Sequence, residues 1–345
     1  MRVLVTGHNG YIGSVMVPVL KMAGHDVVGL DTFFFEECTL RDEEHRVPAI
    51  RKDIRDVQAG DLQGFDAVVH LAALCNDPLG DLHPEWTRDI NHLASVHLAR
   101  LSRDAGVRRF LYASSCSMYG AAGGDDILTE DAPLRPLTAY AVSKVRTEED
   151  VAKLADAAFS PVFMRNATAY GASPRLRADV VLNNLVCWAH TTGRIRLTSD
   201  GSAWRPIVHV DDIARAFAAA LAAPRQIVHN QAFNVGANGE NYQVRALAEI
   251  VRSIVPGCSV EYAKEAGADP RSYRVDFSRL TRTFPDLEPL WNASAGAKDL
   301  YAALQEAQVT QSDFQGRRYV RLAQIKHLLE AGRLDPTLRW APTAA

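Results

Sequence analysis

Short runs of β-branched residues alternate with amphipathic helical patterns through the first half of the chain. The apolar runs predict six strands, at Arg2–Val5, Asp26–Leu30, Ala49–Lys52, Ala67–Leu71, Arg109–Ala113 and Pro161–Arg165. Helical spacing predicts helices between them, at Tyr11–Met22, Arg88–Asp104 and Thr138–Asp156. This alternation is typical of parallel βαβ units. It therefore predicts an α/β fold with a Rossmann-like, doubly wound parallel sheet.

The second half of the chain is less regular and mostly helical. Helical patterns occur at Asp179–Thr191, Val210–Ala222, Gln243–Ile254, Ala295–Ala307 and Arg318–Ala331, and Phe233–Val235 is typical of one further strand. We interpret residues 1–168 as a dinucleotide-binding domain to which residues 206–237 contribute late elements. Residues 169–205 and 238–345 are then expected to form a smaller, interleaved, mostly helical substrate domain.

Composition and charge exclude several classes of protein. The 345 residues are 47% hydrophobic, and 38 basic against 41 acidic residues give a net charge of −3. The hydrophobic content favours a folded chain with a large core. The nearly balanced charge gives no excess of basic residues to attract nucleic acid. Five scattered cysteines and the absence of a CxxC or HExxH pattern argue against a disulfide framework and a metal site. With no apolar run long enough for a bilayer and no signal peptide, we expect a reduced, cytoplasmic protein without membrane contact.

A glycine-rich turn follows the first predicted strand. The segment Thr6-Gly7-His8-Asn9-Gly10-Tyr11-Ile12-Gly13 leads directly into a predicted helix. Glycines let the backbone approach a pyrophosphate, and the helix N-terminus stabilises its charge. Twenty-four residues after Gly7, the second strand ends at Asp31, where a carboxylate can accept the ribose hydroxyls of NAD and repel the extra phosphate of NADP. A glycine turn alone often has only a structural role, but this ordered combination predicts a dinucleotide site.

Tyr140 and Lys144 lie four residues apart in a predicted helix, so both project from one face. An ammonium group, together with a positively charged oxidised nicotinamide, lowers the pKa of a phenol towards that of a usable base. The alternative is a solvated helix face with an ordinary aromatic anchor. A hydroxyl follows the fifth predicted strand at Ser115, where doubly wound sheets bind ligands, although serines also occur in turns for their own hydrogen bonds.

Together these residues resemble the extended short-chain dehydrogenase/reductases, specifically their NAD-dependent nucleotide-sugar epimerase/dehydratase group, over nearly the whole chain. The resemblance implies a catalytic triad of Ser115, Tyr140 and Lys144 and a homodimer formed by the Arg88–Asp104 and Thr138–Asp156 helices. It implies an NAD site formed by Gly7, Asn9, Gly10, Tyr11, Ile12, Gly13, Asp31, Asp53, Ile54, Leu71, Ala72, Ala73, Tyr140 and Lys144.

The resemblance extends to a site for a nucleotide-diphosphate sugar. Asn184 and Leu185 resemble an element that contacts the substrate diphosphate and base, and Arg205 and Arg271 resemble diphosphate contacts, although a single arginine is more often a surface residue. The remaining substrate residues implied by the resemblance are Ser117, Thr168 and Tyr273. Epimerases usually place an asparagine at the position of Thr168, so the nucleotide and the sugar stay open.

The residues that follow the expected catalytic serine distinguish the reactions that members of this group catalyse. The 4,6-dehydratases carry an Asp-Glu pair where this chain has Cys116 and Ser117. Decarboxylases carry glutamate, and 3,5-epimerases cysteine, at the position of Ser117. The chemistry expected is therefore 4-epimerisation by transient oxidation to a 4-keto sugar and return of the hydride.

Three alternatives stay open. A 4-ketoreductase uses the same triad, but such enzymes commonly consume NADPH, which Asp31 disfavours. Dehydratase or decarboxylase chemistry would need another acid, for which Asp77 is a candidate. A non-catalytic NAD sensor or scaffold would belong to a different class, although such relatives tend to lose the tyrosine or the lysine.

Overall fold

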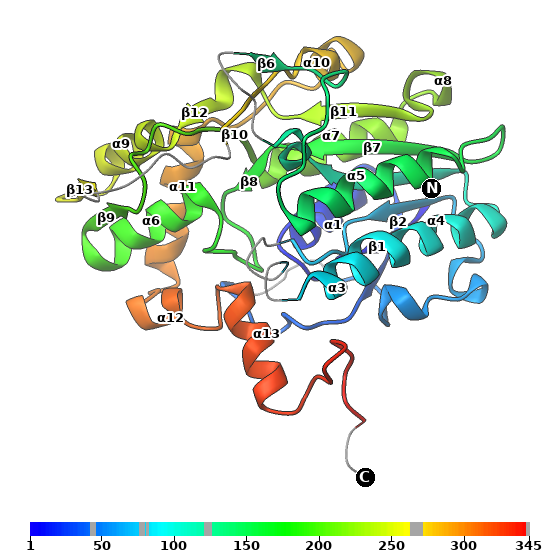
Figure 1. Ribbon diagram of the computed structural model, residues 1–345, viewed down its shortest axis with the longest axis horizontal. Helices are drawn as coiled ribbons and strands as arrows, with labels where there is room; N and C mark the ends of the chain where they lie inside the picture. Colours follow the sequence, from blue (N-terminus) through cyan, green and yellow to red (C-terminus); the bar gives the residue numbers. More distant parts are fainter. Residues whose placement is uncertain (42–45, 76–79, 81–82, 121–125, 263–271, 343–345) are drawn as a thin grey trace.

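A seven-stranded parallel sheet forms the centre of the computed structural model, which describes residues 1–41, 46–75, 80, 83–120, 126–262 and 272–342 (Figure 1). Its spatial order is β11 (Gln231–Val235), β7 (Ser160–Asn166), β5 (Arg109–Ser115), β4 (Ala67–His70), β1 (Arg2–Thr6), β2 (Asp26–Asp31) and β3 (Ala49–Arg51). The chain winds outward from β1 in one direction and then from β4 in the other, so the predicted doubly wound fold is confirmed. The crevice where the winding reverses is the usual ligand site of such sheets.

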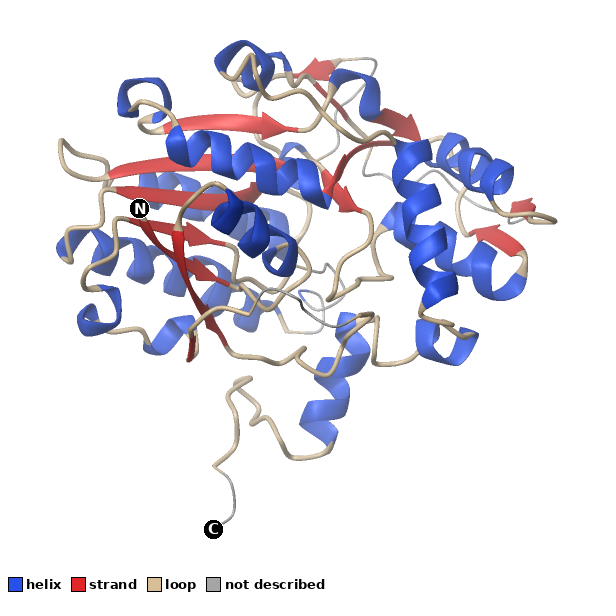
Figure 2. Cartoon of the chain, turned by 180° about the vertical axis from the view of Figure 1, so that it is seen from behind, coloured by secondary structure: helices blue, strands red, loops and turns tan. Residues whose placement is uncertain are grey.

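Helices cover both faces of this sheet, and the alternation along β1 shows why. Val3 and Val5 are fully buried in one core with side chains of α1 (Gly13–Met22) and α7 (Val210–Ala222). Leu4 lies between them in sequence and points to the opposite core, which includes residues of α4 (Ala94–Asp104) and α5 (Ala139–Ala152). A strand with apolar side chains on both faces has to be covered on both faces, and Figure 2 shows helices in front of and behind the sheet.

A third core lies beside the carboxyl ends of the strands. It is built mainly from α6 (Val181–Thr192), α9 (Val244–Ile254) and α11 (Ala293–Glu306). Small sheets accompany it: β8 (Thr168–Tyr170), β10 (Trp204–His209) and β12 (Asn241–Gln243) form one, β9 (Arg194–Leu197) and β13 (Ser259–Tyr262) another, and β6 (Ile127–Leu128) and β14 (Arg274–Val275) a third. None of these short strands was predicted, because they do not follow the regular strand–helix alternation from which most strands of the central sheet were predicted.

Short helical segments complete the described chain. They are η1 (Ile54–Asp56), η2 (Ala59–Leu62), α3 (Pro84–Thr87), η3 (Arg88–Leu93), η4 (Cys116–Tyr119), α8 (Arg225–Val228), η5 (Asn238–Glu240), α10 (Ser278–Thr283), α12 (Gln311–Gln315) and α13 (Arg321–Glu330). The helix α13 and the segment that follows it lie at the lower edge of Figure 1, coloured orange and red.

The longer predicted helices are confirmed, with shifted ends that have local causes. The helix expected from Tyr11 begins at Gly13, because the preceding residues complete the turn. The helix expected to reach Asp156 ends at Ala152, since the Asp156 carboxylate accepts the N–H groups of Ala158 and Phe159 in a turn. The helix expected from Arg88 starts as the π-helical turn η3 before α4 continues it.

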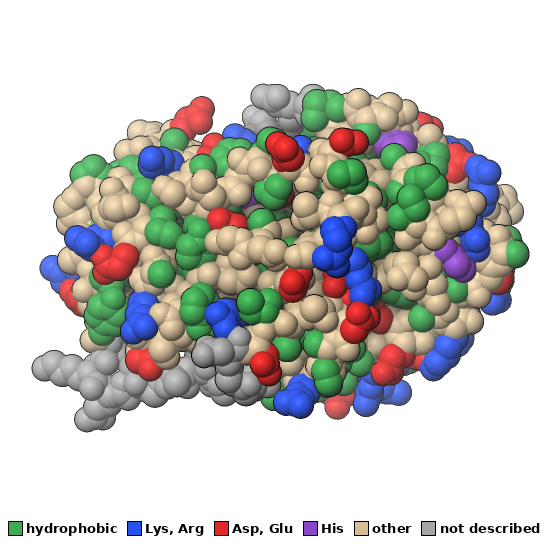
Figure 3. Space-filling model, turned by 90° about the horizontal axis from the view of Figure 1, so that it is seen from above, with side chains coloured by type: hydrophobic (Ala, Val, Ile, Leu, Met, Phe, Trp, Pro, Cys, Tyr) green, Lys and Arg blue, Asp and Glu red, His purple; other side chains and the backbone are tan. Residues whose placement is uncertain are grey.

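Acidic and basic side chains are interspersed over the face shown in Figure 3. None of the helices in the described part of the chain combines the length and apolar character that a membrane span needs.

Candidate active-site cleft

A cleft of about 320 Å³ opens at the carboxyl ends of the central strands. This volume is within the range of small-molecule sites. Its lining brings together most of the residues singled out from the sequence: Gly7, Gly10, Tyr11, Ile12, Gly13, Asp31, Asp53, Ile54, Leu71, Ala72, Ala73, Ser115, Ser117, Tyr140, Lys144, Thr168 and Tyr273.

The glycine turn is tight because its own backbone leaves no room for side chains. A Cβ on Gly13 would lie 2.2 Å from the carbonyl oxygen of Gly7, and one on Gly7, whose φ is +74°, would lie 2.7 Å from the backbone nitrogen of Ala72. The helix α1 that follows has no acidic residue in its first turn and no side-chain N-cap hydrogen bond. Its first N–H groups and its dipole therefore suit an anion such as a pyrophosphate.

Asp31 ends β2 at the edge of the same cleft. Its Oδ1 accepts the N–H of Phe33 at 2.8 Å, and its Oδ2 accepts the N–H of Asn9 at 3.0 Å. Burial raises the pKa of this carboxyl group, while these two hydrogen bonds oppose the shift. Each oxygen keeps lone-pair capacity for a ribose hydroxyl, so the residues present fit the ribose of a dinucleotide.

At another part of the cleft lining, the Asp53 carboxylate caps η1 by accepting the Arg55 N–H at 2.8 Å, and it pairs with the Arg55 guanidinium at 2.6 Å. Nearby, the loop Leu71-Ala72-Ala73 is held by β4. His70 at the end of that strand is buried between Thr6 Oγ1 at 2.7 Å and Ser95 Oγ at 2.8 Å. Burial lowers the pKa of His70 to about 3, so this imidazole is a neutral structural group.

Ser115, Tyr140 and Lys144 meet on the opposite side of the cleft. Lys144 is almost fully buried; its Nζ donates to the carbonyl of Ala113 at 2.6 Å and lies 5.6 Å from the centroid of the Tyr140 ring. Burial raises the pKa of Tyr140 to about 12, whereas the Lys144 charge and a hydrogen bond with Ser115 act in the lowering direction. The expected effect of the lysine is present, but on its own it is outweighed by desolvation.

Three buried polar atoms near this triad have no hydrogen-bond partner among the described residues. They are Ser114 Oγ, Ser117 Oγ and Asn166 Oδ1, and all three residues line the cleft. Buried polar groups are nearly always satisfied in folded proteins. The arrangement therefore suits a polyhydroxylated ligand. Asn166 was not selected from the sequence, although its place at the end of β7, in register with Ser115 of β5, is the signal that could have identified it.

The structure does not bring every predicted residue into the cleft. The Asn9 side chain accepts the Nε–H of Arg175 at 3.2 Å and lines a neighbouring hollow, so only its backbone contacts Asp31. Asn184 Nδ2 donates to the carbonyl of Ala178 at 3.0 Å, and Leu185 is buried in the third core. Arg205 Nη1 donates to the carbonyl of Trp204 at 2.9 Å, outside the cleft lining. Arg271 lies outside the described residues, as does Asp77.

Two arginines of the cleft were missed by sequence reasoning. Arg177 lines it and pairs with Asp179 at 2.9 Å. Arg321 reaches it from α13, near the end of the chain. No strand-end or turn signal marks either position, and Arg321 comes from a helix remote in sequence from the nucleotide-binding elements.

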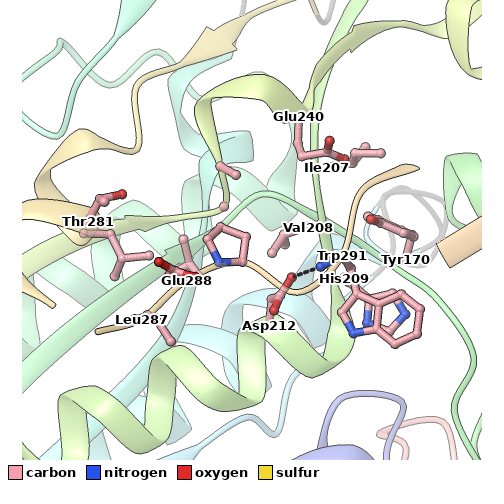
Figure 4. A pocket seen from close by; sticks show the side chains of 15 residues that line it. Tyr170, Ile207, Val208, His209, Asp212, Glu240, Thr281, Leu287, Glu288 and Trp291 are labelled. Carbon is pink, nitrogen blue, oxygen red and sulfur yellow. Dashed lines mark hydrogen bonds between the residues drawn. The ribbon is translucent and has the colours of Figure 1, made fainter. Parts of the chain in front are cut away.

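A second, much smaller cavity lies between β10, α7 and the segment before α11 (Figure 4). Its volume of about 20 Å³ accommodates a single water molecule. Glu240 lines it, with Oε2 accepting the Ala293 N–H at 2.9 Å, and burial raises the pKa of this carboxyl to about 7. The His209 ring stacks on the Trp291 ring, with 4.1 Å between the ring centroids. Burial lowers the pKa of His209 to about 4. This cavity is too small for a sugar or a nucleotide.

Comparisons with known proteins agree with the geometry of the cleft. Residues 3–236 match the model of the "NAD dependent epimerase/dehydratase family". A UDP-glucose 4-epimerase of Corynebacterium glutamicum is 30% identical over 288 residues, which are 78% of this chain and 85% of that protein. The UDP-glucuronic acid 4-epimerase of Bacillus cereus, solved with UDP-glucuronic acid and NAD, is 25% identical, with a TM-score of 0.76 and coverage of 89% of this chain and 99% of that one. The dTDP-glucose 4,6-dehydratase DesIV of Streptomyces venezuelae, solved with NAD, is 26% identical, with a TM-score of 0.75 and coverage of 89% and 97%. With its glycine turn, the Asp31 carboxylate at the end of β2 and this extent of similarity, the chain belongs to the NAD-dependent epimerase/dehydratase family.

Proposed function

We propose that this protein is an NAD-dependent nucleotide-sugar 4-epimerase. The observation that carries the proposal is the convergence of Ser115, Tyr140 and Lys144 in the same cleft as Asp31 and the glycine turn. Curated relatives and a solved structural neighbour named as UDP-sugar 4-epimerases support it.

The glycine turn and Asp31 would hold NAD, which would supply a hydride acceptor and, in its oxidised form, a positive charge that adds to the effect of Lys144 on the phenol. Tyr140 takes the proton of the sugar 4-hydroxyl and later returns a proton to the 4-keto oxygen. Ser115, hydrogen-bonded to the phenol, orients it. Lys144 stabilises the phenolate and is itself fixed by the Ala113 carbonyl.

The residues after Ser115 favour epimerisation over elimination of water. Elimination requires a general acid and a base near carbons 5 and 6 of the sugar. Cys116 is fully buried, its thiol donates to the carbonyl of Arg165 at 3.1 Å, and burial raises its pKa, so it is no acid for the cleft. Ser117 faces the cleft but carries no carboxyl group. With Thr168, Tyr273 and Asn166, Ser117 is a proposed contact for sugar hydroxyls.

The experiment is incubation of the purified protein with UDP-glucose and, separately, UDP-galactose, followed by chromatographic separation of the products. Interconversion without net consumption of added NAD supports the proposal. Formation of a 4-keto-6-deoxy sugar would assign a dehydratase, and stoichiometric loss of NADH or NADPH with a keto sugar would assign a reductase. Absence of any reaction across UDP-, dTDP-, GDP- and CDP-sugars would favour a sensor.

The outer part of the substrate site and the division of the chain stay proposals. On the family resemblance alone, Asn184, Leu185, Arg205 and Arg271 stay proposed contacts of the substrate diphosphate and base. The division into a dinucleotide domain (1–168 with 206–237) and a substrate domain is supported by the parallel pairing of β11 with β7.

We also propose a homodimer in the cytoplasm. Leu93 is 44% exposed just before α4, and Leu137 is 52% exposed just before α5, which supports a contact through these helices. Light scattering coupled to gel filtration tests the dimer, because Leu93→Lys should produce monomers. Fractionation of cells tests the location.

A further inference from the structure

The side chain of Arg321 is a buried cation with incomplete hydrogen bonding. It is 5% exposed and lines the cleft, and its Nη2 donates to the carbonyl of Arg175 at 2.7 Å. Its Cζ lies 4.5 Å from the centroid of the Phe35 ring, so the guanidinium stacks on an aromatic face. Its Nη1 is buried and has no hydrogen-bond partner among the described residues.

Within the described part of the chain, no carboxylate forms an ion pair with Arg321. Burial, and to a lesser extent the charges of Arg177 and Arg175, lower the pKa of Arg321 to about 10. The carboxylate of Asp179 also acts on it, but Asp179 is already paired with Arg177 at 2.9 Å. A buried guanidinium without its own carboxylate is costly unless an anion compensates it.

The position of Arg321 indicates which anion this is. Arg321 lines the same cleft as Tyr11, which belongs to the glycine turn. Phe35, on which it stacks, follows Asp31 by four residues in the loop after β2. Gln324, one turn further along α13, donates to the carbonyl of Phe34 at 3.0 Å and holds the helix against that loop. Arg321 is thus placed beside the turn and the ribose-side loop, on the dinucleotide side of the cleft.

We propose that Arg321 binds the diphosphate of NAD together with the glycine turn. A guanidinium fork suits phosphate oxygens, and the free Nη1 supplies a charge-assisted donor. The C-terminal helix α13 then contributes a binding residue to a site otherwise built from the first half of the chain. This inference rests on the cofactor and is independent of which sugar reacts.

The test measures the affinities of NAD and adenosine for protein stripped of its dinucleotide, using calorimetry on three variants. Arg321→Gln removes the charge, Arg321→Lys keeps a charge without the fork, and Lys326→Gln removes a charge from an exposed position of the same helix. We expect Arg321→Gln to weaken NAD roughly ten- to hundred-fold while adenosine, which lacks phosphate, is unaffected. The NAD affinity of Arg321→Lys should lie between those of Arg321→Gln and the unchanged protein. The NAD affinity of Lys326→Gln should match that of the unchanged protein.

Other results overturn the proposal. Unchanged NAD affinity in Arg321→Gln removes the residue from the site, and equal weakening of NAD and adenosine assigns it a purely structural role. Loss of UDP affinity in the NAD-loaded protein, with NAD affinity retained, would assign Arg321 to the substrate diphosphate instead. If Arg321→Gln fails to fold, the comparison of NAD with adenosine in Arg321→Lys decides. Absence of epimerase activity in the unchanged protein would contradict only the proposed reaction.

Discussion

The indole Nε1 of Trp340 donates a hydrogen bond of 2.6 Å to the carbonyl of Thr32, the residue directly after Asp31. Its ring also lies 5.5 Å from that of Phe34, in an edge-to-face arrangement. The Arg55 guanidinium fixes the same C-terminal segment by donating to the carbonyls of Thr337 at 2.7 Å and Leu338 at 2.9 Å. Residues remote in sequence from β2 therefore brace the loop that follows Asp31.

Replacement of this indole should loosen that loop. We expect Trp340→Ala to lower the free energy of unfolding by about 1–3 kcal/mol, because a partly buried ring and a hydrogen bond are both lost. Trp340→Phe, which keeps a ring, should cost about 1 kcal/mol. Urea denaturation measures both values. Identical stabilities for the two variants and the unchanged protein would show that the C-terminal segment does not brace the loop.

Tyr140→Phe should abolish most turnover while preserving the fold and NAD binding, because only the proton-accepting hydroxyl is removed. A loss of roughly 10²- to 10⁴-fold in kcat is expected. Tyr170→Phe is the matched control, since the Tyr170 hydroxyl is also buried, has no partner among the described residues and lies outside the cleft. Near-normal kcat in Tyr140→Phe would remove this residue from its proposed role.

Asp31→Ala should weaken the binding of NAD roughly ten-fold or more, because the ribose hydroxyls lose a charged acceptor. It should also reduce the preference for NAD over NADP, because the repulsion of a 2′-phosphate disappears. The measurement is the ratio of the two dissociation constants. Asp26→Asn, at the exposed opposite end of β2, serves as the control. The ribose assignment fails if the ratio stays the same in Asp31→Ala.

Glu240 makes stability depend on pH. Its pKa is raised from 4.5 to about 7, so the folded protein keeps a proton that the unfolded chain has already lost at intermediate pH. Stability from this group is complete below pH 4.5 and is lost as the pH rises through 7, a difference of roughly 3 kcal/mol. Glu240→Gln, which is always neutral, should therefore raise Tm at pH 8 relative to the unchanged protein and have little effect at pH 4.5. Thermal melts at both pH values test this, and an equal change at both would contradict it.

Much of the cleft could be predicted because its residues follow directly from strand ends. Gly7, Asp31 and Ser115 each stand where a hydrophobic run stops, and parallel strands bring their carboxyl ends to one edge. The helical spacing of Tyr140 and Lys144 likewise predicts that both project from one face. The protonation of Tyr140 could not be predicted in this way, because it depends on how far burial opposes the lysine.

The alternation of apolar and polar residues by itself determined the parallel sheet, its order of βαβ units and the edge at which a ligand binds, because these depend on local periodicity and on short connections. Only the tertiary structure decided that Asn166 joins Ser115 in the cleft, that the Asn9 side chain points away from it, and that α13 brings Arg321 into the cleft lining that includes the glycine turn. Such contacts join residues far apart in sequence, and they depend on the packing of whole elements, which leaves no local pattern along the chain.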